Sequence, residues 1–181
     1  VIGDLEKSQS IKVQKQFYKE QDVTSGKHKG DTFRIYKNRK TLNKISMISG
    51  HLPNKANEIA IDRLYAENNK IKLGDTLNIN GHKFKVSGFS AFSDYSALFK
   101  NNADMMFDAQ KFTVAIVTDG VWDDLGDNGI VYSYAWRNKD QKLSEKAQKD
   151  KAVDIKDELI GKHVMLNDII ARPDNNAIMF T

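Results

Sequence analysis

The chain has 181 residues, of which 40% are hydrophobic and 29% charged, and it contains no cysteine. These values are typical of a folded domain and exclude the collagen-like and disordered classes. The missing cysteines exclude a disulfide scaffold, a thiolate zinc site, an iron–sulfur cluster and a cysteine nucleophile. A chain of this length forms one domain, or one domain with a small lobe inserted in it.

The positive charge is carried almost entirely by lysine. The net charge is +4, from 23 Lys and 5 Arg against 24 acids. Lysines alternate with acids, as in Lys149-Asp150-Lys151, and such mixing is typical of a solvated surface. Nucleic-acid recognition relies on the bidentate arginine fork, so we expect no nucleic-acid partner. The alternative to a solvated surface is a Lys-rich face that lies near anionic lipid headgroups.

The first third of the chain predicts strands after a short helix. A helix is expected to end within Asp4–Ser8, and an extended pattern begins at Ser10. Turn residues at 25–30 precede a returning strand, Thr32–Tyr36, which makes a hairpin. A further short apolar run covers Ile45–Ser49.

The middle of the chain has the clearest local signals. Glu58–Asp62 predicts a strand, after which Asp62 caps a short helix over residues 63–69, with Leu64 and Tyr65 on its buried side. Asn80-Gly81 predicts a hairpin between strands 76–80 and 82–88, because a type I′ turn needs positive φ.

The last third combines strands with the longest helix. Strands are predicted at 112–118 and 130–136. The pattern over 139–160 predicts a helix that ends at a C-cap glycine, Gly161. A final short helix is predicted over 166–171.

No catalytic or metal-binding motif is complete. The sequence has no Gly-x-Ser-x-Gly elbow, and the four histidines (His28, His51, His82 and His163) lack the spacing of a helical metal site. An acidic cluster, Asp119, Asp123, Asp124 and Asp127, invites a calcium interpretation. It fails the EF-hand pattern, because the acid required at its twelfth position is Ala135. Capping and turn formation are therefore the preferred role of these acids, with calcium titration as the test.

The strands over Thr76–Phe92 resemble half of an OB-like nucleic-acid-binding barrel, but their alternation favours a scaffold. Phe84 and Val86 fall on one face of the strand, and Lys83 and Lys85 fall on the other. This pattern predicts one face buried in the core and one face exposed to solvent. The glycines 74, 81 and 88 are seven apart, which matches no phosphate-binding loop.

One block carries a family resemblance. It runs from Ser49-Gly50-His51-Leu52-Pro53 through Glu58-Ile59-Ala60-Ile61-Asp62, and continues as Lys72-Leu73-Gly74-Asp75 to Phe84-Lys85-Val86-Ser87-Gly88. In order and spacing it resembles a block of the extracytoplasmic domains of FtsX-like (MacB-like) ABC transporter permeases of the Gram-positive type. His51 stands where that family usually has arginine.

The resemblance implies a fold and an activity. The implied fold is α+β, MacB periplasmic-core-like: a porter-like lobe with a mixed or antiparallel sheet (residues 1–45 and 105–181) and a small β-rich lobe (46–104). The implied protein is not an enzyme and needs no cofactor or metal. ATP is hydrolysed by a separate cytoplasmic subunit, coupled through membrane helices, and the domain lies on the extracellular face of the cell membrane. It relays motion and binds substrate, an extracellular protein or peptide, or a second permease copy.

Twelve positions of the block are expected to build the scaffold. Each has a local structural reason, such as the fixed φ of proline or the turn-forming freedom of glycine. They are Gly50, Pro53, Glu58, Ile59, Ile61, Asp62, Gly74, Asp75, Gly81, Phe84, Val86 and Gly88.

The expected recognition surface lies just after the block. Phe89, Phe92, Tyr95 and Phe99 stand among small residues with few charges, and an exposed apolar patch marks a binding site. The alternative is that these rings are buried between the two lobes.

The ends of the chain predict a segment of a longer polypeptide. It begins at Val1 and closes on the apolar run Ala177-Ile178-Met179-Phe180-Thr181. Asp174–Ile178 resembles the approach to a membrane helix in the same family. Two other functions are left open: a free-standing extracellular ligand-binding module, and a hydrolase with a site assembled from scattered Asp, Glu and His.

Overall fold

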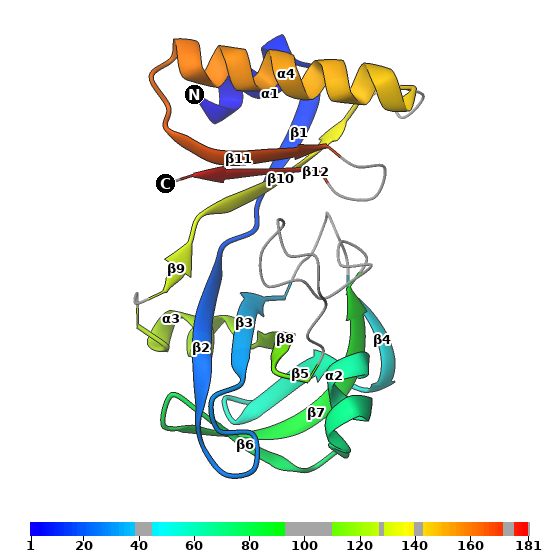
Figure 1. The fold of residues 1–181 in the computed structure, drawn as a ribbon, viewed down its shortest axis with the longest axis vertical. Helices are drawn as coiled ribbons and strands as arrows, with labels where there is room; N and C mark the ends of the chain where they lie inside the picture. The colour runs from blue at the N-terminus through cyan, green and yellow to red at the C-terminus, as the bar shows by residue number, and fades with distance from the viewer. Residues whose placement is uncertain (39–44, 93–109, 127–128, 140–142, 172–175, 181) are drawn as a thin grey trace. The chain divides into compact units, whose positions relative to one another are not determined.

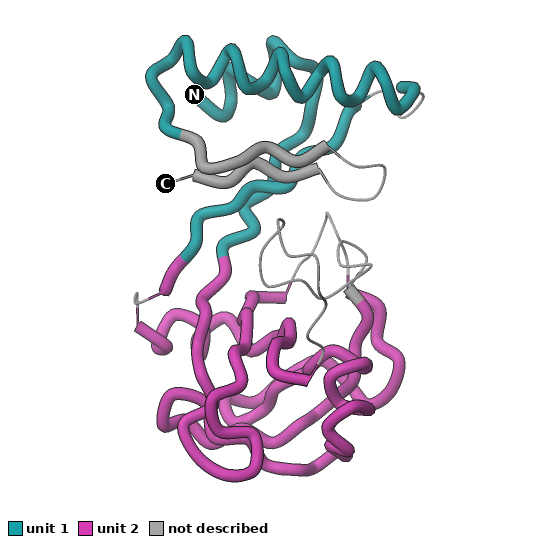
Figure 2. Tube along the Cα trace, viewed as in Figure 1, with its two compact units in different colours: residues 1–17, 41–43, 131–181 teal, residues 18–40, 44–130 magenta. Residues whose placement is uncertain are grey.

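The computed structural model describes residues 1–38, 45–92, 110–126, 129–139, 143–171 and 176–180 (Figure 1). The chain forms two compact units (Figure 2). Unit 1 comprises Val1–Phe17, Thr41–Asn43 and Val131–Thr181, and unit 2 comprises Tyr18–Lys40 and Lys44–Ile130.

Unit 1 combines an antiparallel sheet with two helices. Its sheet has four strands in the order β1-β10-β12-β11, and every neighbouring pair is antiparallel. Its elements are α1 (Ile2–Ser8), β1 (Ile11–Lys15), β10 (Ser133–Asn138), α4 (Glu145–Gly161), β11 (Leu166–Ala171) and β12 (Asn176–Phe180). In Figure 1, α1 and α4 lie over the same face of this sheet.

A small apolar core joins the helices of unit 1 to its sheet. Leu5 of α1, Trp136 of β10 and Leu159 of α4 are buried together. The remaining members are Ile11, Ala152 and Ile155. Glu158 adds a polar link between α4 and α1, because its Oε2 accepts from Ser8 Oγ at 2.7 Å and from Gln9 Nε2 at 2.9 Å.

The predicted long helix exists with different ends. It begins at Glu145 rather than at 139, because the Ser144 side chain accepts from the Ala147 N–H and caps it. Gly161 is its last helical residue and not a left-handed C-cap as predicted. The left-handed conformation falls on His163, with φ of 58°.

The predicted helix over 166–171 is wrong. These residues form β11, which pairs with β12 in the register Ile169↔Ile178. The apolar run at the end of the chain therefore has a partner on both sides, because β12 also pairs with β10. Six residues with two adjacent β-branched side chains favour a strand once such a neighbour is available.

Unit 2 is built mainly from strands. Its elements are β2 (Tyr18–Ser25), β3 (Thr32–Lys37), β4 (Ile45–Gly50), β5 (Glu58–Asp62), α2 (Arg63–Asn69), β6 (Thr76–Ile79), β7 (His82–Phe92), β8 (Phe112–Val117) and α3 (Asp119–Asp124). Strand β9 (Ile130–Val131) lies where the chain leaves this unit. The predicted hairpins and the strands at 58–62 and 112–118 are confirmed.

Six strands of unit 2 close on themselves. The order β3-β8-β5-β7-β6-β2 ends on a strand that also pairs with β3. The pairs β3–β8 and β5–β7 are parallel, and the others in this ring are antiparallel. Closure removes free edges from these strands. Strand β4 lies outside the ring, on the C-terminal half of β7.

The core of unit 2 lies inside this ring. All six residues of β8 are buried, as are all five of β5. Alternation along β7 follows the prediction, since Phe84 and Val86 are buried while Lys83 and Lys85 are exposed. Trp122 connects α3 to this ring of strands, because its Nε1 donates to the Ile35 carbonyl at 2.9 Å.

The compact units do not coincide with the predicted lobes. Strand β8 pairs with β3 on one side and with β5 on the other. These pairings tie residues from both predicted lobes (1–45 with 105–181, and 46–104) into one closed sheet. As a division into functional lobes, the predicted boundaries stay a prediction. The α+β fold class is confirmed, with helices and mixed or antiparallel sheets in the same chain.

Candidate functional site: the scaffold block and its groove

The block at residues 49–88 brings two glycines into direct opposition. Gly50 of β4 pairs with Gly88 of β7. A Cβ on Gly50 would stand 2.2 Å from the Ser87 carbonyl oxygen, and Gly50 also has φ of 71°. A Cβ on Gly88 would stand 2.6 Å from the His51 carbonyl oxygen. Only glycine lets the two backbones approach this closely, so these positions fix β4 against β7.

A bulge between β5 and β7 lies beside the two glycines and is linked to the segment that follows β4. The β5–β7 register shifts between Ile59 and Ala60. Next to this shift, the buried Ser87 hydroxyl donates to the carbonyls of His51 and Ile59, at 3.0 and 3.3 Å. The bulged backbone is thereby connected to both neighbouring segments.

Glu58 organises the turn around Pro53. The residue is largely buried, and its carboxylate accepts from the Asn54 N–H at 3.0 Å and from the Lys55 N–H at 3.2 Å. The Asn54 hydrogen bond is the largest cause that lowers the pKa of Glu58, so the charged form is favoured. Glu58 is thus a structural anion and not a proton donor.

Asp62 and Tyr65 fix helix α2 on the barrel. Asp62 Oδ1 accepts from the Leu64 N–H at 2.8 Å, which confirms the predicted cap. Burial raises the pKa of Asp62, and this hydrogen bond opposes the shift. Tyr65 is fully buried and donates from its hydroxyl to Asp31 Oδ2 at 2.6 Å. Leu64, predicted as buried, is exposed, and Ala66 takes its place against the barrel.

The turns before and after β6 follow the predicted chemistry. Asp75 Oδ2 accepts from the Lys72 N–H at 2.8 Å, and the Gly74 N–H donates to the Val86 carbonyl at 2.8 Å. Asn80 and Gly81 have φ of 47° and 80°, as a type I′ hairpin requires. Four other block residues are at most 1% exposed and belong to the core of unit 2: Ile59, Ile61, Phe84 and Val86. The contacts of these residues therefore stabilise the fold.

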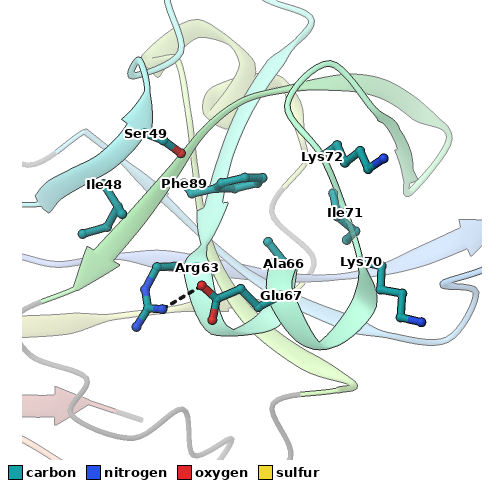
Figure 3. Close-up of a pocket in the computed structure, with 9 residues that line it drawn as sticks. All are labelled: Ile48, Ser49, Arg63, Ala66, Glu67, Lys70, Ile71, Lys72 and Phe89. Atoms are coloured by element: carbon teal, nitrogen blue, oxygen red, sulfur yellow. Dashed lines mark hydrogen bonds and ion pairs between the residues drawn. The ribbon is translucent and has the colours of Figure 1, made fainter.

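A groove lies on the outside of this scaffold, between β4, α2 and β7 (Figure 3). Its volume is about 280 Å³. It is lined by Ile48, Ser49, Arg63, Ala66, Glu67, Lys70, Ile71, Lys72 and Phe89. In Figure 3 the Phe89 ring lies near the middle, with Ile48 and Ser49 on one side and the two lysines on the other.

The groove has an apolar floor and a mostly basic rim. Ala66 and Ile71 are 1% and 7% exposed and form its base, while Ile48 on the rim is 54% exposed. Glu67 is already paired, because its Oε1 accepts from Arg63 Nη1 at 2.7 Å. Lys70 and Lys72 are exposed and have no side-chain hydrogen bond or ion pair within the part of the chain that the structure describes. An anionic, partly apolar group is the chemistry that such a surface complements.

One residue of the predicted recognition surface lines the groove, and the others cannot be placed. Phe89 is half-buried in it. The side chain of Phe92, and residues Tyr95 and Phe99, lie outside the described residues. Sequence reasoning missed Ile48, Ala66 and Ile71, whose meeting depends on three separate elements. The single available signal was the close spacing of Lys70 and Lys72, the second of which begins the latter half of the block.

The structure shows no metal site among its described residues. No group of three His, Asp or Glu side chains there is arranged to hold an ion. Of the acidic cluster, Asp123 forms an ion pair with Lys37 at 2.7 Å, and Asp127 lies outside the described residues. No helix in the described ranges is long and apolar enough to cross a membrane.

Comparison with known proteins gives structural matches only. No family model and no curated protein matches the sequence. The chain is similar to the extracellular domain of the noncanonic ABC-type transporter YknZ from Gram-positive bacteria, with 12% identity and a TM-score of 0.47, over 99% of this chain and 87% of that one. It is also similar to the periplasmic region of MacB from Actinobacillus actinomycetemcomitans, with 12% identity and a TM-score of 0.45, over 98% of this chain and 76% of that one.

Proposed function

We propose that the chain is a non-catalytic extracytoplasmic domain of an ABC transporter permease. In this role a separate cytoplasmic subunit hydrolyses ATP, and membrane helices of the permease carry the resulting motion to the domain. The domain relays that motion and recognises a substrate or partner outside the membrane. It belongs to the extracellular face of the cell membrane.

The observation that carries this proposal is the scaffold block. Residues 49–88 resemble the permease block in order and spacing, and their described contacts serve to hold backbone segments together. Gly50 and Gly88 set the distance between two strands, and Glu58 and Asp62 satisfy backbone N–H groups. These scaffold positions serve backbone packing and turns, which suits a protein that transmits displacement and does not suit one that performs chemistry.

The closed ring of strands supports the relay function. Each of its six strands is hydrogen-bonded on both sides. A packed core inside such a ring moves as one body, because dense interiors respond to force in discrete steps rather than by continuous deformation. Unit 2 is then a stiff element in the relay of motion.

The test uses the complete gene product. We expect its reading frame to continue into hydrophobic spans on both sides of this segment. We also expect the detergent-solubilised polypeptide to co-purify with an ATP-hydrolysing subunit. A complete polypeptide without any hydrophobic span would contradict the proposal and favour the free-standing binding module. Turnover of a substrate by the purified chain would favour the hydrolase.

A further inference from the structure

The groove between β4, α2 and β7 has the features of a peptide-docking site. We propose that it binds an extended acidic segment of a partner protein. One large apolar side chain of that segment packs over Phe89, and its carboxylates pair with Lys70 and Lys72. This inference rests on the recognition role proposed above and specifies the chemistry of the partner.

The size of the groove favours binding of a single side chain of a peptide rather than of a complete small molecule. Its volume is about 280 Å³. Sites for drug-sized ligands occupy roughly 300–1,000 Å³ and bury most of the ligand. The groove is slightly below that range. It therefore suits one or two large side chains of a segment that continues across the surface.

The charge of the rim selects an acidic segment. Arg63 and Glu67 neutralise each other across 2.7 Å. Lys70 and Lys72 remain, with no carboxylate partner among the described residues, so the groove presents two uncompensated positive charges at one end. Complementary charges at a rim steer the encounter and select the partner, while apolar contacts at the centre supply affinity.

The apolar wall is fixed before a partner arrives. The β4–β7 register shifts between Met47 and Ser49, so Ile48 is the extra residue of a bulge. Its side chain is 54% exposed at the groove. The Gly50–Gly88 approach holds this part of β4 in place. A rigid site loses less conformational entropy on binding.

The experiment selects from a library of displayed random octapeptides on the full chain. The test variants are the double substitution K70E/K72E and the single substitution I48S. The matched controls are K83E/K85E, which changes two exposed lysines of β7 outside the groove, and L73S, which removes an apolar side chain that is 47% exposed elsewhere. Circular dichroism confirms that each variant folds.

We expect enriched peptides to combine at least one large apolar residue with two or more Asp or Glu. Their affinity should fall about tenfold or more in K70E/K72E, fall about threefold in I48S, and stay unchanged in both controls. Amide NMR signals of Ala66 and Phe89 should shift on titration with a selected peptide. The affinity should weaken as salt is added, because the charges are exposed.

Several outcomes would overturn the docking proposal. These are the absence of any enriched consensus, a consensus without acidic residues, or equal binding by K70E/K72E and the wild-type chain. Sedimentation with phosphatidylglycerol vesicles that depends on Lys70 and Lys72, without peptide selection, would assign the groove to a lipid surface instead. None of these results bears on whether the gene product is a permease, which the hydrophobic spans decide separately.

Discussion

The two units differ in how their buried polar groups are satisfied. In unit 2 the buried carboxylates of Glu58 and Asp62 accept backbone N–H groups, and the buried hydroxyl of Ser90 donates to the Ile61 carbonyl at 3.2 Å. In unit 1, three buried side-chain atoms of described residues have no hydrogen-bond partner. They are Gln16 Nε2, Trp136 Nε1 and Asn138 Oδ1.

This difference between the units arises from where the sequence places its polar residues. The polar residues of the scaffold block lie where backbone groups need a partner, and the block coincides with the part of the chain whose structure local patterns predict best. Unit 1 depends on a small apolar core and on strands that meet from both ends of the chain. We therefore expect unit 2 to be the more stable and more rigid of the two.

Each unit contains one tryptophan, which allows the comparison to be measured. Trp122 lies in unit 2 and Trp136 in unit 1, and both are buried. A W136F background reports urea unfolding of unit 2 by fluorescence, and a W122F background reports unit 1. Coincident transitions in the two backgrounds would show that the units unfold as one, which would remove the basis of the comparison.

The largest effect is expected for Gly50→Ala. Its Cβ would clash with the Ser87 carbonyl, and φ of 71° disfavours an L-residue. We expect a loss of about 3–5 kcal/mol in the free energy of unfolding of unit 2. Gly81→Ala is the matched control: φ is 80° but no atom lies within 4 Å of the added Cβ, so the cost is about 1–2 kcal/mol. Equal losses in the two variants would show that close approach is unimportant.

The next effect is expected for Leu159→Ala in unit 1. Leu159 is fully buried in the small core of that unit. Removing it should cost about 2–4 kcal/mol, seen in the Trp136 transition and absent from the Trp122 transition. Ile160→Ala is the control, because Ile160 is 52% exposed and its truncation should change stability by less than about 0.5 kcal/mol. A large loss in the control would mean that this helix face is covered in solution.

A smaller effect concerns acid. Hydrogen bonds from Lys162, Ser8 and Gln9 lower the pKa of Glu158 to about 2. A depressed folded-state pKa contributes stability that is present above the ordinary value of 4.5 and is lost as pH falls toward about 2. The Trp136 transition should therefore weaken over this interval. In Glu158→Gln the part of the slope due to this group should vanish, and an unchanged slope would contradict the assignment.

The smallest effect tests the unpartnered groups directly. Gln16→Met keeps the side-chain volume and removes the buried Nε2 that has no partner. We expect the stability of unit 1 to stay within about 1 kcal/mol of wild type or to rise. Ser90→Ala in unit 2 removes a paired hydroxyl and should cost about 1 kcal/mol. A clear loss in Gln16→Met would show that Gln16 is paired in solution.

Local signals predicted one helix cap and one hairpin turn of the block correctly, for physical reasons. The Asp62 cap and the Asn80-Gly81 turn each depend on residues adjacent in sequence. The strand at 166–171 was predicted as a helix, because its identity depends on pairing with β12. The closed ring was not predicted, since it depends on β2 pairing with both β3 and β6. The groove escaped prediction for the same reason, because no local pattern links Ile48 to Ala66 and Phe89.

The central claim is that this domain faces the outside of a cell as part of a membrane protein. These 181 residues contain no cysteine, so a thiol introduced here is detected as the labelling gained over the parent polypeptide, which is treated in parallel. Met165→Cys is suited to this purpose, because Met165 is 72% exposed. The substitution is made in the complete gene product, and intact cells are treated with a membrane-impermeant maleimide.

We expect the thiol to be labelled in intact cells and the labelled polypeptide to stay with the membranes after an alkaline carbonate wash. Labelling only after lysis, or release of the polypeptide into the soluble fraction, would contradict the central claim.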